Sequence, residues 1–344
     1  MKINELPVSG HERLASCTDG DYHGLIAIHS TRLGPALGGT RLWQYRNQQE
    51  AIDDVLRLSR GMTYKNALAG VPFGGGKSII LKNNGAVDRK AIFRMHGRFV
   101  ETFGGQYITA EDVGTSPEDL EHVREETQHV AGLLSGSGNP SPVTARGVFR
   151  AMQAAAKYRW GDDSLEGRTV AIQGCGSVGY YLASYLNKAG ASLIVSDVDA
   201  RKVERVVSEF DAMAYGPDDI YYADADVFAP CALGGILNDE TIHALKTQIV
   251  AGAANNQLLE PRHGDELAAL NILYVPDYAA NSGGVINGLR DLLGWDAAQS
   301  AAKVDEIYDT VFNIFRIAES EGIPTYKAAD RLAEERLGGH VVHS

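Results

Sequence analysis

One short segment constrains the fold of this chain more than any other. The apolar run TVAIQG at 169–174 leads directly into GCGSVG, which opens a predicted helix. Gly174, Gly176 and Gly179 thereby stand in GxGxxG register. The first glycine permits a tight turn, the second lets backbone N–H groups approach a pyrophosphate, and the third lets the helix pack on the strand. The segment therefore predicts a dinucleotide-binding βαβ unit, whereas an ordinary glycine turn would not require these flanks.

The second strand of this unit, SLIVSD at 192–197, ends in an acid at the place where dinucleotide-binding proteins bind a ribose. Asp197 follows the glycines by about twenty residues and is expected to accept a hydrogen bond from the ribose 2′-OH. A 2′-phosphate would meet a like charge there, so the sequence favours NAD over NADP, although Arg201 weakens this preference. The candidate cofactor residues of the segment are Gly174, Gly176, Ser177, Val178, Gly179 and Asp197.

The chain predicts an α/β protein of two domains, because its 344 residues exceed the size at which a single core usually stops growing. After a Gly/Ser/Pro-rich hinge at 132–144, short apolar strands alternate with helices, which is typical of a Rossmann-type doubly wound sheet. We expect an N-terminal α/β substrate-binding and oligomerisation domain at 1–136 and an NAD-binding domain at 137–321. The apolar stripe of the last helix predicts that 322–344 packs back on the first domain.

Periodicity indicates individual elements in both domains. Strands are expected at 24–30, 77–82, 106–112, 225–230, 247–253 and 271–277, and helices at 50–68, 89–103, 117–127, 144–160 and 324–337.

Composition excludes several classes of protein. The formal charge of -12 and the lack of a basic cluster argue against a nucleic-acid-binding surface. The first thirty residues do not resemble a secretory leader, and no apolar run approaches a membrane span, so we expect a cytoplasmic protein that does not bind membranes. Cys17, Cys175 and Cys231 are scattered, and no histidine or cysteine pair has metal-ligand spacing, so no metal is predicted.

The run GVPFGGGKS at 70–78 looks like a phosphate-binding loop but has the wrong spacing, since Gly70 lies one residue too far from Gly76. We therefore expect a loop that holds Lys77 rather than a triphosphate. Lys65 lies upstream of it, after an apolar helix, and Asp112 lies downstream. Lysines are mostly exposed, but these two stand where a side chain is held. Two lysines and a carboxylate ahead of a nicotinamide-binding unit indicate hydride chemistry on a substrate with a carboxylate and a carbonyl.

Nine collinear blocks resemble the amino acid dehydrogenase family of glutamate, leucine, phenylalanine and valine dehydrogenases, and most of all its leucine dehydrogenase branch. The match runs nearly from end to end, which makes it far more specific than any single motif. The blocks are LGPALGGTR (33–41), RGMTYKNA (60–67), GGGKS (74–78), ITAEDVGTS (108–116), SGNPSPVTARGV (137–148), APCALGG (229–235), GAANNQL (252–258), PDYAANSGGVIN (276–287) and PTYKAADRLAEERL (324–337).

The resemblance implies roles for individual residues. Lys65, with the backbone of Gly38 and Gly39, matches the group that binds the substrate α-carboxylate. Lys77 matches the lysine that polarises the keto oxygen and activates water, and Asp112 matches the proton shuttle to the amino nitrogen, whereas the adjacent Glu111 receives no role. The other residues assigned in this way are Met62 and Asn281 on the substrate side and Thr144, Ala232 and Asn255 near the cofactor.

The resemblance further implies NAD-dependent, reversible oxidative deamination of an L-amino acid to a 2-keto acid and ammonia, by a homo-oligomer of two to eight subunits. Leu37, Ala110, Val285 and Gly288 match the positions that line the side-chain pocket. None is charged, so an apolar substrate such as leucine, isoleucine or valine is expected. Because leucine dehydrogenases usually carry valine where this chain has Gly288, aromatic substrates such as phenylalanine stay open.

Two other classes remain as alternatives. A non-catalytic NAD-binding regulatory protein would be expected to have replaced Lys65, Lys77 or Asp112, and all three are present. A Rossmann-type dehydrogenase of hydroxy acids would need a histidine paired with a carboxylate, and no histidine stands in a fitting position.

Overall fold

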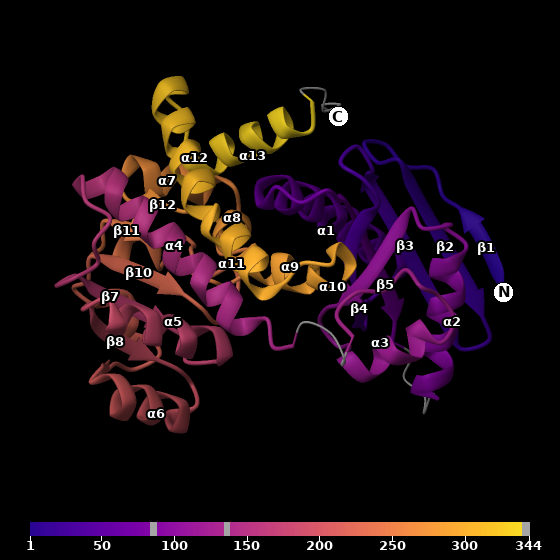
Figure 1. Ribbon diagram of the computed structural model, residues 1–344, viewed down its shortest axis with the longest axis horizontal. Helices are drawn as coiled ribbons and strands as arrows, with labels where there is room; N and C mark the ends of the chain where they lie inside the picture. The colour runs from indigo at the N-terminus through magenta and orange to yellow at the C-terminus, as the bar shows by residue number, and fades with distance from the viewer. Residues whose placement is uncertain (83–87, 134–137, 339–344) are drawn as a thin grey trace. The chain divides into compact units, whose positions relative to one another are not determined.

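The structure, a computed structural model, describes residues 1–82, 88–133 and 138–338 (Figure 1). The chain divides into two compact units, and the first of them gathers three separate stretches of the sequence. Part of the predicted hinge at 132–144 lies outside the described residues. The first unit comprises Met1–Gly138, Gly288–Trp295 and Ala333–Ser344, and the second comprises Asn139–Asn287 and Asp296–Leu332.

The first unit is built on a mixed six-stranded sheet of order β1-β2-β3-β5-β4-β6. Strands β1, β2, β3 and β5 pair antiparallel in turn, whereas β4 pairs parallel with both β5 and β6. The three parallel strands therefore end at the same edge of the sheet. The strands are β1 (Lys2–Glu5), β2 (Arg13–Asp19), β3 (Tyr22–Ser30), β4 (Ala36–Trp43), β5 (Gly74–Leu81) and β6 (Tyr107–Glu111).

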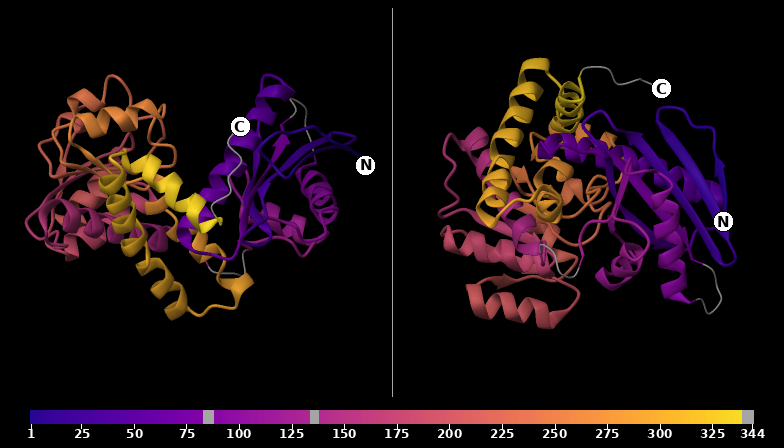
Figure 2. Two further views of the ribbon diagram at one scale, coloured as in Figure 1. Left: turned by 90° about the horizontal axis from the view of Figure 1, so that it is seen from above. Right: turned by 45° about the vertical axis from the view of Figure 1, so that its right-hand side comes forward.

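Helices cover the two faces of this sheet differently (Figures 1 and 2). Helix α1 (Gln48–Ala69) packs on one face, where Val55 shares a core with Ile79 of β5. Helices α2 (Arg89–Glu101) and α3 (Pro117–Arg124) cover the other face, where Phe93 shares a core with Ile80. Alternate residues of β5 thus enter opposite cores, as the two-residue period of a strand requires.

The three consecutive glycines of the sequence lie inside strand β5, so the prediction of a loop at this point is wrong. The glycines are needed because β5 is a central strand with close neighbours. A Cβ atom at Gly74 would lie 1.9 Å from the carbonyl oxygen of Ser30, and one at Gly75 would lie 2.1 Å from the backbone nitrogen of Thr63 in α1. Neither distance is possible, so only glycine lets α1 and β3 approach β5 this closely.

Helix α1 has well-formed ends that follow from its sequence. The side chain of Asn47 accepts a hydrogen bond from the backbone N–H of Glu50, and Gly70 ends the helix in the left-handed conformation with φ 63°. Both are standard capping arrangements. The C-terminal turn is also contacted by the end of the chain, because Arg336 donates to the carbonyl oxygens of Ala67 and Leu68 at 3.0 and 2.6 Å.

The second unit contains a six-stranded sheet of order β12-β11-β10-β7-β8-β9 in which every pair is parallel. This is the predicted doubly wound sheet, and its strand order reverses between β7 and β10. Ligands of such sheets bind at the carboxyl ends of the strands beside this reversal. The strands are β7 (Thr169–Gln173), β8 (Ser192–Ser196), β9 (Met213–Ala214), β10 (Val227–Pro230), β11 (Ile249–Val250) and β12 (Leu273–Tyr274).

Helices connect the parallel strands of the second unit and pack on both faces of the sheet. Phe228 and Val250 enter a core with residues of the short helices η1, η2 and α7, whereas α5 packs beside α4. The remaining helical segments of the described chain, of which α10 belongs to the first unit, are α4 (Ser141–Trp160), α5 (Ser177–Lys188), α6 (Ala200–Phe210), η1 (Asp219–Tyr222), η2 (Ile242–Ala244), α7 (Arg262–Ala269), α8 (Asp277–Ala280), α9 (Gly283–Gly288), α10 (Arg290–Leu293), α11 (Ala297–Asp305), α12 (Ile307–Glu321) and α13 (Thr325–Arg336).

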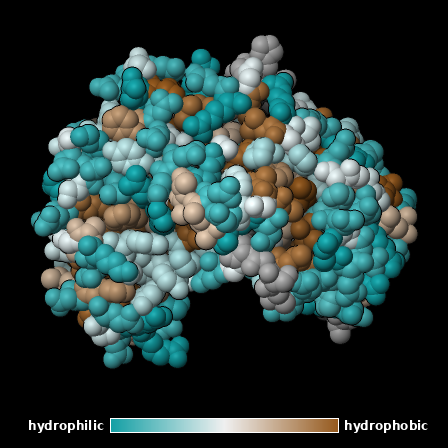
Figure 3. All heavy atoms as spheres, viewed as in Figure 1, coloured by the Kyte–Doolittle hydropathy of each residue, from teal (hydrophilic) through white to brown (hydrophobic). Residues whose placement is uncertain are grey.

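The face of the molecule seen in Figure 3 is mainly hydrophilic, in keeping with a chain of 44 acidic and 32 basic residues. No helix in the described part of the chain combines the length and the apolar character needed to span a bilayer.

Candidate active site

Most of the predicted site residues of the first unit lie on the face of its sheet that α1 covers. A Cβ atom at Gly75 would meet Thr63 of α1, so Gly75 faces this helix, and Lys77 follows it with the same orientation. Leu37 pairs with Gly75, and Gly39 pairs with Ala110 of β6. Residues paired across strands share a face, so Leu37, Gly39, Lys77 and Ala110 lie on one side of the sheet.

Directly after the carboxyl end of β6, Asp112 forms ion pairs with a residue of the adjacent strand β4 and with one of β5, which lies on the other side of β4. The Nζ of Lys77 lies 3.1 Å from Oδ2 of Asp112, and the Nε of Arg41 lies 2.9 Å from the same oxygen. The side chain of Lys77 is only 6% exposed and that of Asp112 is 22% exposed. The structure therefore brings the two predicted catalytic residues into direct contact in a largely buried setting.

This arrangement shifts the protonation equilibria of both groups. The pKa of Lys77 is lowered because burial removes its ammonium from water, and the attraction of Asp112 offsets only part of that effect. For Asp112 burial alone would raise the pKa, but Lys77 and Arg41 together outweigh it and hold the pKa of the carboxyl below its ordinary value. A lysine with a lowered pKa beside an ionised carboxylate is suited to exchanging protons with a substrate.

Lys65 and Met62 lie on the C-terminal part of α1, and both are partly buried. The neighbouring Asn66 fixes the end of this helix to the sheet, because its Nδ2 donates to the carbonyl oxygen of Gly74 at 2.6 Å. The position of Lys65 is thereby tied to the first residue of β5, three residues before Lys77.

Gly38 and Gly39 have a packing reason to be glycines. A Cβ atom at Gly38 would lie 1.7 Å from the carbonyl oxygen of Gly76, and one at Gly39 would lie 2.4 Å from that of Glu111. The hydroxyl of Tyr107 donates to the carbonyl oxygen of Gly38 at 2.6 Å. The backbone of β4 is therefore held tightly against β5 and β6 at this point.

The glycine-rich turn of the second unit has the predicted geometry. Gly174 has φ 102°, a conformation that favours glycine, and Gly176 caps the N-terminus of α5, which Ser177 and Val178 begin. A Cβ atom at Gly179 would lie 1.9 Å from the carbonyl oxygen of Gly174. An added Cβ at Gly176, in contrast, would meet nothing within 4 Å, so the backbone there faces open space at a helix N-terminus.

Asp197 and Ala232 complete the surroundings of this turn. Asp197 accepts hydrogen bonds from the backbone N–H groups of Cys175 and Asp199, both at 2.8 Å. Ala232 follows β10, and its Cβ would lie 2.9 Å from a Cβ added at Gly174. Both residues therefore stand at the carboxyl edge of the sheet, beside the reversal of strand order. The guanidinium of Arg201 forms an ion pair with Asp199, at 3.2 Å.

The remaining predicted residues of the second unit gather around Asn281. Its Nδ2 donates to Oδ1 of Asn255 at 2.8 Å and to the carbonyl oxygen of Ala253 at 3.1 Å. Thr144, at the start of α4, lies near α9, the helix that begins just after Asn281. A Cβ atom added at Gly284 in α9 would come within 2.8 Å of the Oγ1 of Thr144. The sequence blocks around 144, 255 and 281 thus meet in space although they lie far apart in the chain.

Comparison with known proteins decides the family. Residues 14–129 match the model of the Glu/Leu/Phe/Val dehydrogenase dimerisation domain, and residues 136–201 and 197–338 match that of Glutamate/Leucine/Phenylalanine/Valine dehydrogenase. These matches cover most of the chain. The chain belongs to the Glu/Leu/Phe/Val dehydrogenase family. It is therefore an amino acid dehydrogenase that uses a nicotinamide dinucleotide.

Relatives in this family differ in the substrate that their names give. The chain is 51% identical over 332 residues to leucine dehydrogenase of Bacillus subtilis (strain 168), covering 95% of this chain and 91% of that protein. It is 45% identical over 340 residues to phenylalanine dehydrogenase of Caldalkalibacillus thermarum (strain TA2.A1), covering 96% and 92%. The crystal structure of L-tryptophan dehydrogenase from Nostoc punctiforme superimposes with a TM-score of 0.88 at 45% identity and covers 96% of both chains.

The residues predicted to line the side-chain pocket have different surroundings in the structure. Leu37, Ala110 and Gly288 belong to the first unit, whereas Val285 belongs to the second. Leu37 is buried, and Ala110 is partly buried. An added Cβ at Gly288 would meet nothing within 4 Å, so the space beside this residue is open.

A buried polar network beneath the β4–β6 strands was not predicted from the sequence. His96 of α2 contacts the hydroxyl of Tyr22 at 2.8 Å through Nδ1, and the hydroxyls of Thr40 and Ser78 at 2.9 and 3.1 Å through Nε2. Thr40 directly precedes Arg41, and Ser78 directly follows Lys77. The network therefore fixes the two strands that carry the cations around Asp112. The one sequence signal for this network is the presence of polar residues, such as Thr40 and Ser78, inside strands that are otherwise mostly apolar.

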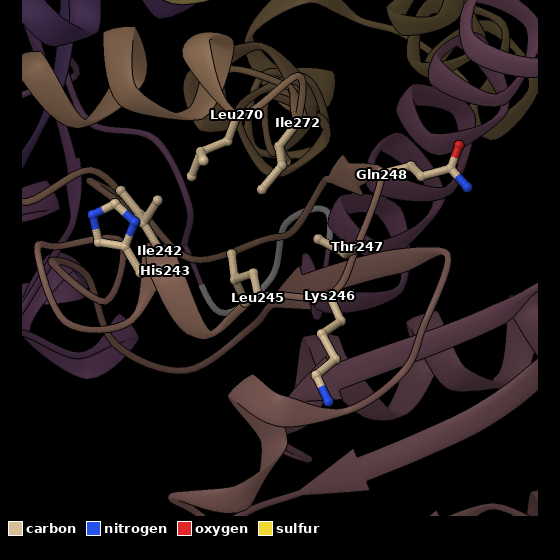
Figure 4. A pocket seen from close by; sticks show the side chains of 8 residues that line it. All are labelled: Ile242, His243, Leu245, Lys246, Thr247, Gln248, Leu270 and Ile272. Atoms are coloured by element: carbon tan, nitrogen blue, oxygen red, sulfur yellow. The ribbon is translucent and has the colours of Figure 1, made fainter.

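The pocket in Figure 4 lies in another part of the second unit. Its cavity of about 300 Å³ is lined by residues that precede β11 and β12, among them Leu245, Leu270 and Ile272. In Figure 4 the ammonium of Lys246 and the amide of Gln248 point away from these apolar side chains. The pocket therefore lies at the amino ends of the parallel strands and includes no predicted site residue.

Among the described residues, one group has the spacing of metal ligands, namely Asp239, His263 and Glu266, whose ligand atoms lie within 4.8 Å of one another. Arg262 already forms ion pairs with both of its acids, because Nη1 lies 2.6 Å from Asp239 Oδ1 and 2.7 Å from Glu266 Oε1. A side chain of the protein itself thus places a positive charge beside these acids.

Proposed function

We propose that this dehydrogenase catalyses the NAD-dependent oxidative deamination of apolar L-amino acids, with leucine, isoleucine and valine preferred. The observation that carries the proposal is the buried contact of 3.1 Å between Lys77 Nζ and Asp112 Oδ2, since it supplies a proton donor and acceptor in one place. The 51% identity to a leucine dehydrogenase supports the aliphatic preference.

In this proposal each polar residue has a distinct task. Lys65 binds the α-carboxylate, together with the backbone of Gly38 and Gly39. Asp112 takes the proton of the amino nitrogen and returns it when ammonia leaves. Lys77 stabilises the charge that develops on oxygen when water adds to the imine carbon. The rigid setting of Lys77 and Asp112 means that neither group must reorganise as the charge develops.

The second unit fits a nicotinamide dinucleotide. The open backbone at Gly176 offers N–H groups at the N-terminus of α5, and the close approach of Gly179 to Gly174 leaves no room for a Cβ atom. We expect the pyrophosphate to bind at this turn, with Ala232, Thr144 and Asn255 nearby. When bound, the nicotinamide supplies the acceptor for the hydride that leaves the substrate Cα.

NAD rather than NADP is proposed on the charge of Asp197. A carboxylate at the end of β8 can accept from a ribose 2′-OH but repels a 2′-phosphate. Arg201, the cation that could receive such a phosphate, is paired with Asp199 at 3.2 Å. Breaking that ion pair would add to the cost of binding NADP.

Aromatic amino acids are the second candidate class of substrate, and the open space beside Gly288 favours them. Phenylalanine and L-tryptophan dehydrogenases at 45–46% identity stand beside the leucine enzymes among the relatives. Leu37, Ala110 and Val285 present no charge, so a second carboxylate, as in glutamate, would be left unpaired at a real cost.

The match of residues 14–129 to a dimerisation domain supports a homo-oligomer, and we propose between two and eight subunits in the cytoplasm. Size-exclusion chromatography with light scattering measures the number. A monomer at micromolar concentration would contradict the proposal.

Steady-state reduction of NAD and NADP by a panel of substrates tests the function. We expect turnover with leucine, isoleucine and valine, weak turnover with glutamate, none with 2-hydroxy acids, and a kcat/KM for NAD at least tenfold above that for NADP. A kcat/KM for phenylalanine a hundredfold above that for leucine would establish the aromatic alternative. Binding of NAD without turnover of any substrate would establish a binding protein.

A further inference from the structure

Arg41 is held between two acids that come from different elements. Its Nε lies 2.9 Å from Asp112 Oδ2 after β6, and its Nη1 lies 3.0 Å from Asp54 Oδ2 on α1. The side chain is only 20% exposed. A guanidinium presents donors in a fixed fork, so simultaneous pairing with two carboxylates determines its position.

Asp54 is itself fixed by further contacts. Its Oδ2 also accepts a hydrogen bond from the hydroxyl of Tyr45 at 2.7 Å, and its Oδ1 accepts one from Nη2 of Arg57 at 2.8 Å. The Asp54 side chain is 16% exposed. Arg41 is therefore anchored at its far end by a carboxylate that has no freedom to turn.

The two cations around Asp112 converge on one of its oxygens. Arg41 Nε and Lys77 Nζ both reach Oδ2, at 2.9 and 3.1 Å. A carboxylate held by two charge-assisted contacts on one oxygen keeps a single rotation, which presents its other oxygen in a fixed direction. An arrangement with Lys77 alone would leave the carboxylate free to turn about that contact.

We propose, on the basis of the proposed function, that Arg41 is a positioning residue, which with Asp54 as its anchor holds Asp112 so that Oδ1 exchanges the substrate proton. Arg41 does not itself touch the reacting atoms in this account. It acts through Asp112, and through the charge that it places beside Lys77.

The charged and titratable groups around Asp112 come from four elements. Lys77 lies on β5, Arg41 on β4, Asp54 on α1, and Tyr107 and Glu111 on β6. After burial, which raises it, the pKa of Asp112 is lowered by Lys77 and then by Arg41. The pKa of Lys77 is lowered by burial and, against the attraction of Asp112, lowered further by Arg41.

Removal of the Arg41 charge therefore raises the pKa of both Asp112 and Lys77. The acidic and the basic limb of the pH–rate profile should therefore both move to higher pH, whether Asp112 or Lys77 governs each of them. A purely structural defect would lower the rate without moving the limbs, so the direction of the shift separates the two explanations.

Three variants test the proposal. Arg41→Gln removes the charge and both ion pairs, Arg41→Lys keeps the charge but cannot reach both acids, and the control Arg46→Gln removes only an exposed ion pair with Glu50. We expect Arg41→Gln to move both apparent pKa values of kcat upward by half a unit or more and to lower kcat at least tenfold. Arg41→Lys should lower kcat while both limbs of the pH–rate profile keep their positions. Arg46→Gln should stay within twofold of the parent.

The thermal midpoint and NAD binding of each variant show whether it folds. A folded Arg41→Gln variant with unmoved limbs would overturn the proposal, and so would an Arg41→Lys variant with the kcat of the parent. If Arg41→Gln does not fold, the Arg41→Lys result decides. Failure of the proposed function would show differently, as a parent protein that reduces no NAD with any amino acid.

Discussion

The Nζ of Lys77 and the Oδ2 of Asp112 lie 3.1 Å apart, with only 6% of the Lys77 side chain exposed. The two residues are separated by more than thirty positions in the sequence and meet because β5 and β6 both flank β4 and run parallel to it. Proton transfer in this dehydrogenase is therefore expected to depend on a preformed pair rather than on a side chain recruited from solvent.

Asp112→Asn removes the charge while keeping nearly the same shape. We expect kcat to fall by about 10²–10⁴, the range that a general acid–base group contributes. The adjacent Glu111→Gln is the matched control, because Glu111 is exposed and forms none of the contacts to Lys77 and Arg41. Initial rates with saturating leucine measure both. Equal losses in the two variants would contradict the role of Asp112.

The buried imidazole of His96 makes stability depend on acid pH. Burial lowers the pKa of His96 to about 3, against an ordinary value of 6.5. Between these values the unfolded chain binds the proton and the folded chain does not, so stability rises with pH over this window and is lost as pH falls below 6.5. At pH 4.5 this single group should cost about 2–3 kcal/mol relative to pH 7.5.

Urea unfolding of the parent and of His96→Gln at the two pH values measures this contribution. The variant loses hydrogen bonds to Tyr22, Thr40 and Ser78 and should be the less stable protein at pH 7.5. Because glutamine does not titrate, the gap between the two proteins should narrow at pH 4.5. A gap that stays constant or widens in acid would contradict the account.

Gly288→Val tests the substrate pocket. An added Cβ at Gly288 meets nothing within 4 Å, so the fold should accept a larger side chain. Since methylene-sized changes in apolar pockets are worth about 1–3 kcal/mol, kcat/KM for phenylalanine should fall about 10–100-fold. The kcat/KM for leucine should change by less than about threefold, because its smaller aliphatic side chain needs less of the space that the valine would fill. An equal loss for both substrates would place Gly288 outside the pocket.

Arg336→Met tests the contact that ends α1. Arg336 donates to the carbonyl oxygens of Ala67 and Leu68, and α1 has no basic residue in its own last turn. Loss of hydrogen bonds from a charged donor should cost about 1.5–3 kcal/mol of stability. Because Lys65 lies in the same part of α1, KM for leucine should rise more than kcat falls.

Lys327→Met is the control on the same helix, since Lys327 is paired with Asp265 instead. It should leave the KM for leucine unchanged. If Arg336→Met also leaves that KM unchanged while lowering the thermal midpoint, the contact stabilises α1 without positioning Lys65.

The sequence predicted best what local motifs determine. The glycine turn, the strand before it and Asp197 lie within about thirty residues, the length of one βαβ unit, and each has its expected place in the structure. The sequence of β6 alone also predicted that this strand ends at the acidic pair of Glu111 and Asp112. In contrast, the likeness of 70–78 to a phosphate-binding loop predicts a loop at the three glycines 74–76, where the structure has strand β5.

The features that the sequence did not reveal depend on contacts between distant elements. Position 75 is a glycine although it lies inside a strand, because α1 approaches it closely at Thr63, and nothing in the sequence of β5 itself indicates that approach. Arg41 looks like an ordinary strand residue until β6 and α1 bring Asp112 and Asp54 to its two ends. His96 reads as one polar position on a helix, and only the packed structure shows that its partners are buried hydroxyls.

The kinetics of Lys77→Ala test the central claim most directly. The variant should retain NAD binding, measured by fluorescence titration, and should lose at least about 10³-fold in kcat with leucine while KM changes much less, because the interaction lost develops in the transition state. A Lys77→Ala variant that binds NAD and turns over leucine within tenfold of the parent would contradict the account.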